Sequence, residues 1–281
     1  MHTFKSQLIK VMRSPIPILM YHRVLPFEGN WAVTVAQFES QMAYLKRHGY
    51  RALSGPELLA GLRGESVPER AIAITFDDGY RDNWHLAAPI LEKYGMRALL
   101  FVVTSKVKNA PEPLSGDWRE EGDDCFLSWE EIHSMSDSGL FEIHTHTHSH
   151  RRFWLDAQSA SETRRMVYQD VATSIDVLRG QGFVHPLQLA WPWGYFKDDW
   201  LDDIAALGVT GIHTTQLGTN FPGQGSQTIR RVGGEKLNSS ISLKLSLLST
   251  PVVGKFFNSG LSLWTERPRR TKAIGSNSIW I

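Results

Sequence analysis

Short runs of apolar and β-branched residues alternate with helix-like segments over roughly 200 residues, and this alternation constrains the fold more than any other feature. Strands that alternate with helices form parallel sheets, because each connection must return the chain to the same edge. The pattern therefore predicts an α/β fold whose parallel sheet can close as a barrel. Eight runs have the length and composition of strands: Ile16–Met20, Arg51–Leu53, Ala71–Phe76, Ala98–Val103, Phe141–His144, Leu187–Trp191, Gly211–Thr214 and Thr228–Val232.

The helices between these runs have recognisable ends. A capping box places Ser or Thr three residues before Glu or Gln, and it satisfies two backbone N–H groups at a helix start. Three helices are expected to begin at such boxes: Thr34 with Gln37, Ser54 with Glu57, and Ser128 with Glu131. The first and the third of these helices are expected to end at glycines, Gly49 and Gly139. Further helices are expected from Asn83 to Gly95, over Ser161–Arg179 and over Lys197–Leu207.

The pattern changes after Val232. We expect an N-terminal extension (1–15), one domain (16–232), and a C-terminal helix with a basic tail (233–281). Between Lys255 and Lys272 there are five Lys or Arg residues against one acid. This segment is expected to be a last helix packed on the domain with a frayed end. The alternative is a peripheral membrane contact through an amphipathic, basic surface.

Composition excludes some function classes. The formal net charge is +1, so no global field favours nucleic acid or another polyanion. Cys125 is the single cysteine, which rules out an internal disulfide. The N-terminus lacks the apolar core of a signal peptide, and the sequence contains no run of 18 apolar residues. A cytoplasmic location is therefore expected, and membrane association through the tail is the alternative. The sequence does not indicate the oligomeric state.

The run AIAITFDDGYRDN places two carboxylates, Asp77 and Asp78, where a buried strand ends. Successive side chains on an extended strand point in different directions. That arrangement suits two tasks in one site, with one acid binding a metal and its neighbour handling a proton. A solvated turn is the simpler alternative. A nucleotide-binding strand is excluded, because the sequence contains no phosphate-binding G-x-x-x-x-G-K-[ST] motif.

The run HTHTHSH contains four histidines within residues 144–150. His144 with His148, and His146 with His150, are each separated by four residues, a spacing that brings two imidazoles together on a helical turn. Two histidines and one carboxylate are typical of a catalytic zinc or iron site. Zincin chemistry is excluded, because threonine stands where that motif requires glutamate. The spacing leaves both pairs open, and a histidine-rich surface loop is the alternative to a metal site.

Several blocks in one order resemble the NodB-homology polysaccharide deacetylases, carbohydrate esterase family 4, from about Ile16 to Val232. The resemblance is carried by PILMYHRV (17–24), TFDDGYRDN (75–83), RALLFVV (97–103), FLSWEEI (126–132), FEIHTHTHSH (141–150) and WPWG (191–194). It is greatest to the exopolysaccharide branch, the poly-N-acetylglucosamine deacetylases. It implies a distorted (β/α) barrel of about seven parallel strands.

The resemblance also implies roles for individual residues. Asp78, His146 and His150 align with the metal ligands, so His144 and His148 would be neighbours. One divalent ion is implied, with Zn²⁺ first and Co²⁺, Ni²⁺ or Fe²⁺ as alternatives. Asp77 aligns with the general base, and His22, in ILMYHRV, with the acid of the exopolysaccharide branch.

One departure from the family pattern concerns the third block. Ala190 occupies the position where many members have an arginine that orients the base, so the partner of Asp77 is not identified. Aromatic residues nearby could form a wall on which a sugar ring stacks, although core packing is an equal alternative. The candidate substrate-binding residues are Trp191, Trp193, Tyr195 and Tyr80.

The predicted function is a metal-dependent hydrolase that removes an N-acyl group, expected to be N-acetyl, from an amino sugar. Its partner would be a carbohydrate: a polysaccharide, an oligosaccharide or a lipid-linked glycan of the cell envelope. One alternative is a deformylase or another hydrolase of non-peptide C–N bonds with the same fold. The alternative from another class is a catalytically inactive carbohydrate-binding protein.

Overall fold

A closed parallel barrel forms the centre of the molecule in the computed structural model, which describes residues 14–236. Seven strands follow one another in the order β1-β10-β9-β8-β7-β6-β5, and a β1–β5 pairing closes the ring. Every pairing in the barrel is parallel. The barrel strands are β1 (Ile18–Tyr21), β5 (Ala71–Phe76), β6 (Ala98–Val102), β7 (Phe141–Thr145), β8 (Gln188–Ala190), β9 (Gly211–Leu217) and β10 (Ile229–Gly233).

Three short strands lie outside the ring. Strand β4 (Arg51–Ala52) pairs with β5 at the edge of the sheet. Strands β2 (Arg23–Leu25) and β3 (Ala32–Thr34) pair with each other as a separate two-stranded sheet. This small sheet follows β1 directly, so it holds the chain that leaves the carboxyl end of the first barrel strand.

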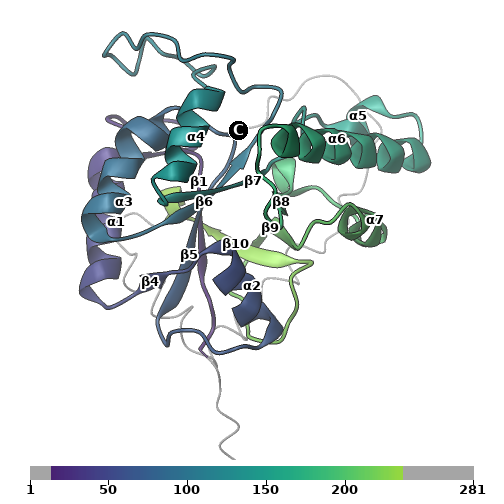
Figure 1. The fold of residues 1–281 in the computed structure, drawn as a ribbon, viewed down its shortest axis with the longest axis horizontal. Coiled ribbons are helices and arrows are strands. Elements are labelled where there is room, and N and C mark those ends of the chain that lie inside the picture. The colour runs from purple at the N-terminus through teal and green to yellow at the C-terminus, as the bar shows by residue number, and fades with distance from the viewer. Residues whose placement is uncertain (1–13, 237–281) are drawn as a thin grey trace, which may run out of the picture.

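Helices cover the outside of the barrel, with α1, α3 and α4 on one side and α6 and α7 on the other (Figure 1). Residues Asn83–Ala87 form a π-helical turn that continues into α3, and Asp198–Trp200 form a 3-10 turn before α7. Shorter 3-10 turns cover Pro192–Gly194 and Gly234–Lys236. The helices are α1 (Val35–Arg47), α2 (Gly55–Arg63), α3 (Ala88–Tyr94), α4 (Trp129–Asp137), α5 (Phe153–Asp156), α6 (Ala160–Gly180) and α7 (Leu201–Ala206).

The sequence-based fold class is confirmed, since the ring has seven parallel strands and outer helices. All three capping boxes are present at α1, α2 and α4. The expectation that Asn83 caps a helix is wrong, because its side-chain amide donates to the carbonyl of His22 instead. The expected C-terminal helix and basic tail lie outside the described residues, apart from 233–236. Among the described residues, no helix is long and apolar enough to cross a membrane.

Both faces of the barrel strands are buried, and the two faces differ in what covers them. On β5 and β6, one set of alternate side chains packs in a large cluster with the outer helices, while the other set joins a smaller cluster of strand residues and two leucines of α2, Leu58 and Leu62. We assign the smaller cluster to the barrel interior. Phe101 belongs to it and contacts three polar side chains, those of His144, His213 and Arg231. The interior is therefore partly polar.

Candidate active site

The carboxyl ends of neighbouring barrel strands bring the sequence motifs together. His22 follows β1, Asp77 and Asp78 follow β5, and His146 follows β7. The backbone N–H of Asp77 donates to the carbonyl of Tyr21 at 2.9 Å, which continues the β1–β5 pairing into the site. The chain turns sharply after the two acids at Gly79, where φ is +85°. A Cβ there would lie 3.2 Å from Val102, so both the backbone conformation and the space favour glycine.

Asp78, His146 and His150 form a cluster that can hold a metal ion. Asp78 Oδ1 lies 3.5 Å from His146 Nε2 and 3.4 Å from His150 Nε2. His146 Nδ1 donates to the carbonyl of Ala190 at 2.8 Å, so its Nε2 presents a lone pair toward Asp78. Asp78 Oδ1 is buried and has no hydrogen-bond partner among the described residues. A buried carboxylate oxygen facing an imidazole lone pair fits a cation between them, so these residues suit the metal that the sequence implied.

His150 is held in the neutral form that a ligand needs. Burial, and next the neighbouring His146, lower the pKa of His150 to about 3. The ring is therefore not protonated at neutral pH and can offer a nitrogen lone pair. The indole Nε1 of Trp193 donates to the carbonyl of His150 at 3.3 Å, which fixes the backbone beside the ligand.

The loop that carries the two histidines is anchored by helix α6. Asp170 on this helix accepts the backbone N–H groups of His148 at 3.0 Å and of Ser149 at 3.2 Å. The loop needs such support, because Thr147 and His150 both have left-handed backbone, with φ of 69° and 54°. Asp170 is thus placed to orient the ligands without touching them.

The structure separates the two histidine pairs. His148 is hydrogen-bonded to Thr104, and His144 lies with Glu142 and His185 in a second cluster of potential ligand atoms. In that cluster the backbone N–H of Gln188 donates to His144 Nδ1 at 3.2 Å, so His144 Nε2 must carry the proton of the neutral ring. His144 Nε2 lies 3.3 Å from Glu142 Oε1. A protonated Nε2 offers no lone pair to a metal, so we interpret the second cluster as structural.

Asp77 has a buried arginine partner. Arg231 on β10 makes two bonds to the carboxylate, from Nη1 to Oδ1 at 2.7 Å and from Nη2 to Oδ2 at 2.8 Å. Burial alone would raise the pKa of Asp77, but the charge of Arg231, with a smaller contribution from His146, outweighs it and holds the pKa well below its usual range. Arg231 therefore does what the arginine absent at Ala190 would do: it keeps the carboxylate ionised and fixes its plane.

His22 has an acidic partner. Glu235 Oε1 accepts from the backbone N–H of His22 at 3.0 Å and lies 2.9 Å from its Nδ1. Burial by itself lowers the pKa of His22, but the hydrogen bond to Glu235 and the negative charges of Asp77, Glu235 and Asp78 outweigh it, so the pKa is raised. With Nδ1 bonded to Glu235, the other ring nitrogen of His22 is left to meet a substrate.

The expected aromatic wall is only partly present. Trp191 is 2% exposed and packs against Phe196 and Trp200, so the expectation that its face stacks on a sugar is wrong. Trp193 is 48% exposed, its ring lies 5.0 Å from that of His150, and the Arg152 guanidinium is 3.7 Å from its centroid. The turn at residues 191–194 thus exposes one tryptophan and buries the other.

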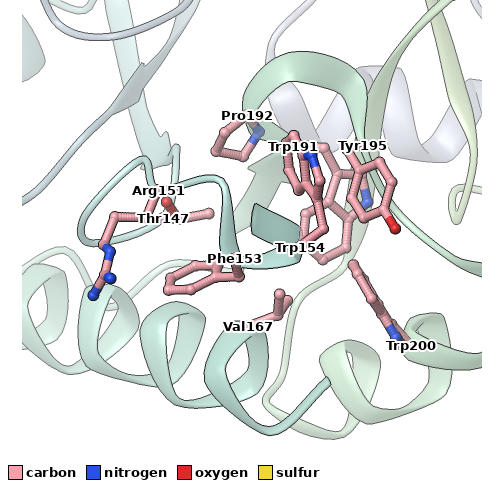
Figure 2. Close-up of a pocket in the computed structure, with 9 residues that line it drawn as sticks. All are labelled: Thr147, Arg151, Phe153, Trp154, Val167, Trp191, Pro192, Tyr195 and Trp200. Carbon is pink, nitrogen blue, oxygen red and sulfur yellow. The ribbon is translucent and has the colours of Figure 1, made fainter. Parts of the chain in front are cut away.

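Trp191 and Tyr195 instead line a small pocket beside the histidine loop (Figure 2). It is partly open and has room for a group the size of a water molecule. Trp191 Nε1 has no hydrogen-bond partner among the described residues, although it is buried. The other residues around the pocket are Thr147, Arg151, Phe153, Trp154, Val167, Pro192 and Trp200.

Tyr80 follows the two acids in the sequence, after Gly79. Its ring stacks on Phe126 at 4.8 Å, and the guanidinium of Arg23 lies 4.7 Å from the ring centroid. Arg23 in turn pairs with the buried carboxylate of Asp82. The ring is therefore part of the packing around the site, and its contact with substrate stays a prediction.

Sequence reasoning missed Arg231, Glu235 and Asp170. An arginine inside the strand-like run TIRRVG was a usable signal for the first, since a charge within a central strand needs a buried partner. Nothing local distinguishes Glu235 or Asp170 from surface acids. Their roles depend on which strand ends the closed barrel brings together.

A parallel barrel with two imidazoles, paired carboxylates and a protonatable histidine at its carboxyl end defines a hydrolase-type site. A profile of the polysaccharide deacetylase family matches residues 64–212, which is more than half of the chain. The chain belongs to the polysaccharide deacetylase family, as the sequence predicted, and it is an enzyme of this class.

Two comparisons show the range of similarity. The poly-beta-1,6-N-acetyl-D-glucosamine N-deacetylase of Staphylococcus aureus (strain MRSA252) is 30% identical over 184 residues, which cover 64% of this chain and 60% of the relative. The chain thus aligns with less than two thirds of that relative's length. The structure of IcaB from Ammonifex degensii shares the fold, with a TM-score of 0.69 at 24% identity, over 83% of this chain and 95% of that one.

Proposed function

We propose that this protein is a metal-dependent N-deacetylase of an amino-sugar polymer, oligosaccharide or lipid-linked glycan. The observation that carries the proposal is the buried, unpartnered Oδ1 of Asp78 facing His146 Nε2 and His150 Nε2, with Asp77 next in sequence. A divalent cation held by these three side chains would acidify water and polarise the acyl carbonyl. Zinc is the proposed ion, because two imidazoles and one carboxylate leave a position open for water and substrate.

The two remaining side chains have partners of opposite charge, Arg231 for Asp77 and Glu235 for His22. Asp77, kept ionised by Arg231, takes a proton from the attacking water as the water oxygen bonds to the acyl carbon. His22, whose pKa is raised by Glu235, gives a proton to the nitrogen as the C–N bond breaks. The products are a carboxylate from the acyl group and a free amine on the sugar.

The small aromatic pocket supports a short acyl group. The pocket has room for a single small group, and a methyl group meets that requirement. Thr147 lines it and follows the ligand His146, so we place the acyl methyl on this side of the site. A formyl group would leave the pocket unfilled. The glycan, its length and the cytoplasmic location stay predictions from sequence.

The test combines metal analysis with amine release from N-acetylated glucosamine oligosaccharides, in the wild type and in Asp77→Asn. Asn keeps the size of the side chain but cannot take a proton. We expect about one metal ion per chain in both proteins, and a loss of turnover by roughly 10²–10⁴ in the variant, the usual scale for a general base.

Formylated and acetylated substrates are compared in the same assay, since a preference for formyl would favour the deformylase alternative. A metal-free wild type that binds glycan without releasing amine would make the protein a carbohydrate-binding relic. Equal turnover by the wild type and Asp77→Asn would contradict the assignment of Asp77 as the general base.

A further inference from the structure

Strained backbone is concentrated at the catalytic end of the barrel. In the part of the chain that the structure describes, five non-glycine residues have left-handed φ: Trp31, Asp78, Thr147, His150 and Trp193, at 54° to 71°. This conformation is unfavourable for residues with a Cβ, and it persists where the surrounding structure enforces it, often at functional sites. The proposed site accounts for four of the five. Asp78 and His150 are candidate metal ligands, and Thr147 lies in the loop that carries the histidines. Trp193 donates to the carbonyl of His150. Trp31 is the one that the mechanism does not use.

Trp31 is held beside the proposed acid. The backbone N–H of Arg23 donates to the carbonyl of Trp31 at 3.1 Å, next to the β2–β3 pair of Arg23 with Ala32. The indole centroid lies 5.3 Å from that of His22, with the rings inclined by 55°. The residue is nevertheless 60% exposed. Single exposed apolar side chains are common, but this one combines exposure with strain and with a place next to His22.

The chemistry of deacylation determines what lies on this side of the site. The proton from His22 goes to the amide nitrogen, and that nitrogen is bonded directly to the sugar ring. The sugar must therefore lie on the His22 side of the breaking bond, with the acyl group on the other. An exposed indole 5 Å from His22 is in reach of that ring.

We propose that Trp31 is a substrate-binding residue, whose indole face stacks on the pyranose that carries the departing nitrogen. The inference rests on the proposed function and specifies how its substrate is bound. An indole suits this ligand, because it offers a broad apolar face to the C–H face of a sugar at little cost in conformational entropy. Trp193, at the His150 side, remains available for another part of the glycan.

The test measures binding separately from turnover, in the metal-loaded Asp77→Asn background. An N-acetylated glucosamine pentasaccharide is titrated calorimetrically with and without Trp31→Ala, and acetate serves as the probe that has the acyl half but no sugar. We expect the pentasaccharide Kd to weaken about ten- to one-hundredfold, the scale of one lost ring-stacking contact. Acetate affinity and metal content should not change.

Two further variants control for folding. Trp31→Phe keeps an aromatic face and should recover most of the affinity. Tyr168→Ala removes a ring that is 40% exposed on α6 and should leave the Kd unchanged. An unchanged pentasaccharide Kd in Trp31→Ala, or equal weakening of pentasaccharide and acetate, would overturn the inference. If the wild type binds the pentasaccharide through Trp31 but releases no amine, the proposed function fails while the binding assignment stands.

Discussion

Each proposed catalytic side chain depends on one partner that is distant in the sequence. Asp77 is oriented by Arg231 and His22 by Glu235, and the two partners are four residues apart at the end of β10. Their charges act in opposite directions, since the cation lowers the pKa of the proposed base and the anion raises the pKa of the proposed acid. A base and an acid that are both ready at one pH are what the reaction requires.

The pH dependence of activity tests the His22–Glu235 pair. In the proposed mechanism catalysis needs protonated His22, so we expect activity to fall as pH rises through the pKa of this ring. Glu235→Gln removes the negative charge that raises this pKa. The alkaline limb of kcat/KM should therefore move to lower pH, while metal content stays the same. The measurement is a kcat/KM–pH profile of both proteins on one N-acetylated oligosaccharide.

The matched control for that profile is Glu65→Gln, an exposed acid paired with Arg63 on the surface. Its alkaline limb should coincide with that of the wild type. A limb that stays in place in Glu235→Gln, or moves to higher pH, would contradict the assigned acid. The same raised pKa stabilises the fold below about pH 6.5, the ordinary value for histidine, and this stabilisation is lost as pH rises through the folded-state pKa.

At the scale of elements, the features that could be predicted from the sequence are those that depend on residues close together in the chain. The capping box of Thr34 with Gln37 spans three residues, so it could be read directly and is present. Strands β2 and β3 were missed because they have three residues each and pair only with one another. The contacts of Arg231 and Glu235 span 154 and 213 residues. They exist only because the ring of strands closes between β10, β1 and β5, which no local pattern reports.

The role of α6 can be tested through Asp170. Asn at this position keeps the shape, but its charge is lost and its NH₂ group cannot accept from the loop N–H groups of His148 and Ser149. The loop should then sample other conformations, and the affinity for Zn²⁺ should fall about 10- to 100-fold, as for other partners that orient ligands. Competition with a chelating dye measures this Kd directly.

Asp176→Asn is the control on the same helix, since Asp176 is exposed. It should bind Zn²⁺ like the wild type, with the same melting temperature. Equal zinc affinity in Asp170→Asn and the wild type would show that the loop holds its shape without the carboxylate.

At the scale of the whole molecule, the proposed metal site is a product of barrel closure. Asp78 follows β5, whereas His146 and His150 follow β7, and β6 lies between these strands in the sheet. In the sequence Asp78 is separated from the two histidines by about 70 residues, so the three side chains come together only in the folded state. A ligand that binds only the native state stabilises it by mass action.

Stability should therefore depend on the metal. At a free Zn²⁺ concentration 1,000 times Kd, the gain is about 4 kcal/mol. For a domain of this size, each kcal/mol moves Tm by about 2–4 °C, so metal removal should lower Tm by about 8–16 °C and re-addition should restore it. Differential scanning calorimetry of dialysed and reloaded protein measures the change. His150→Ala lacks one ligand, so its Tm should respond little to the same treatment. A wild-type Tm that stays constant while the metal is shown to leave would mean that the cation is not bound by these three side chains.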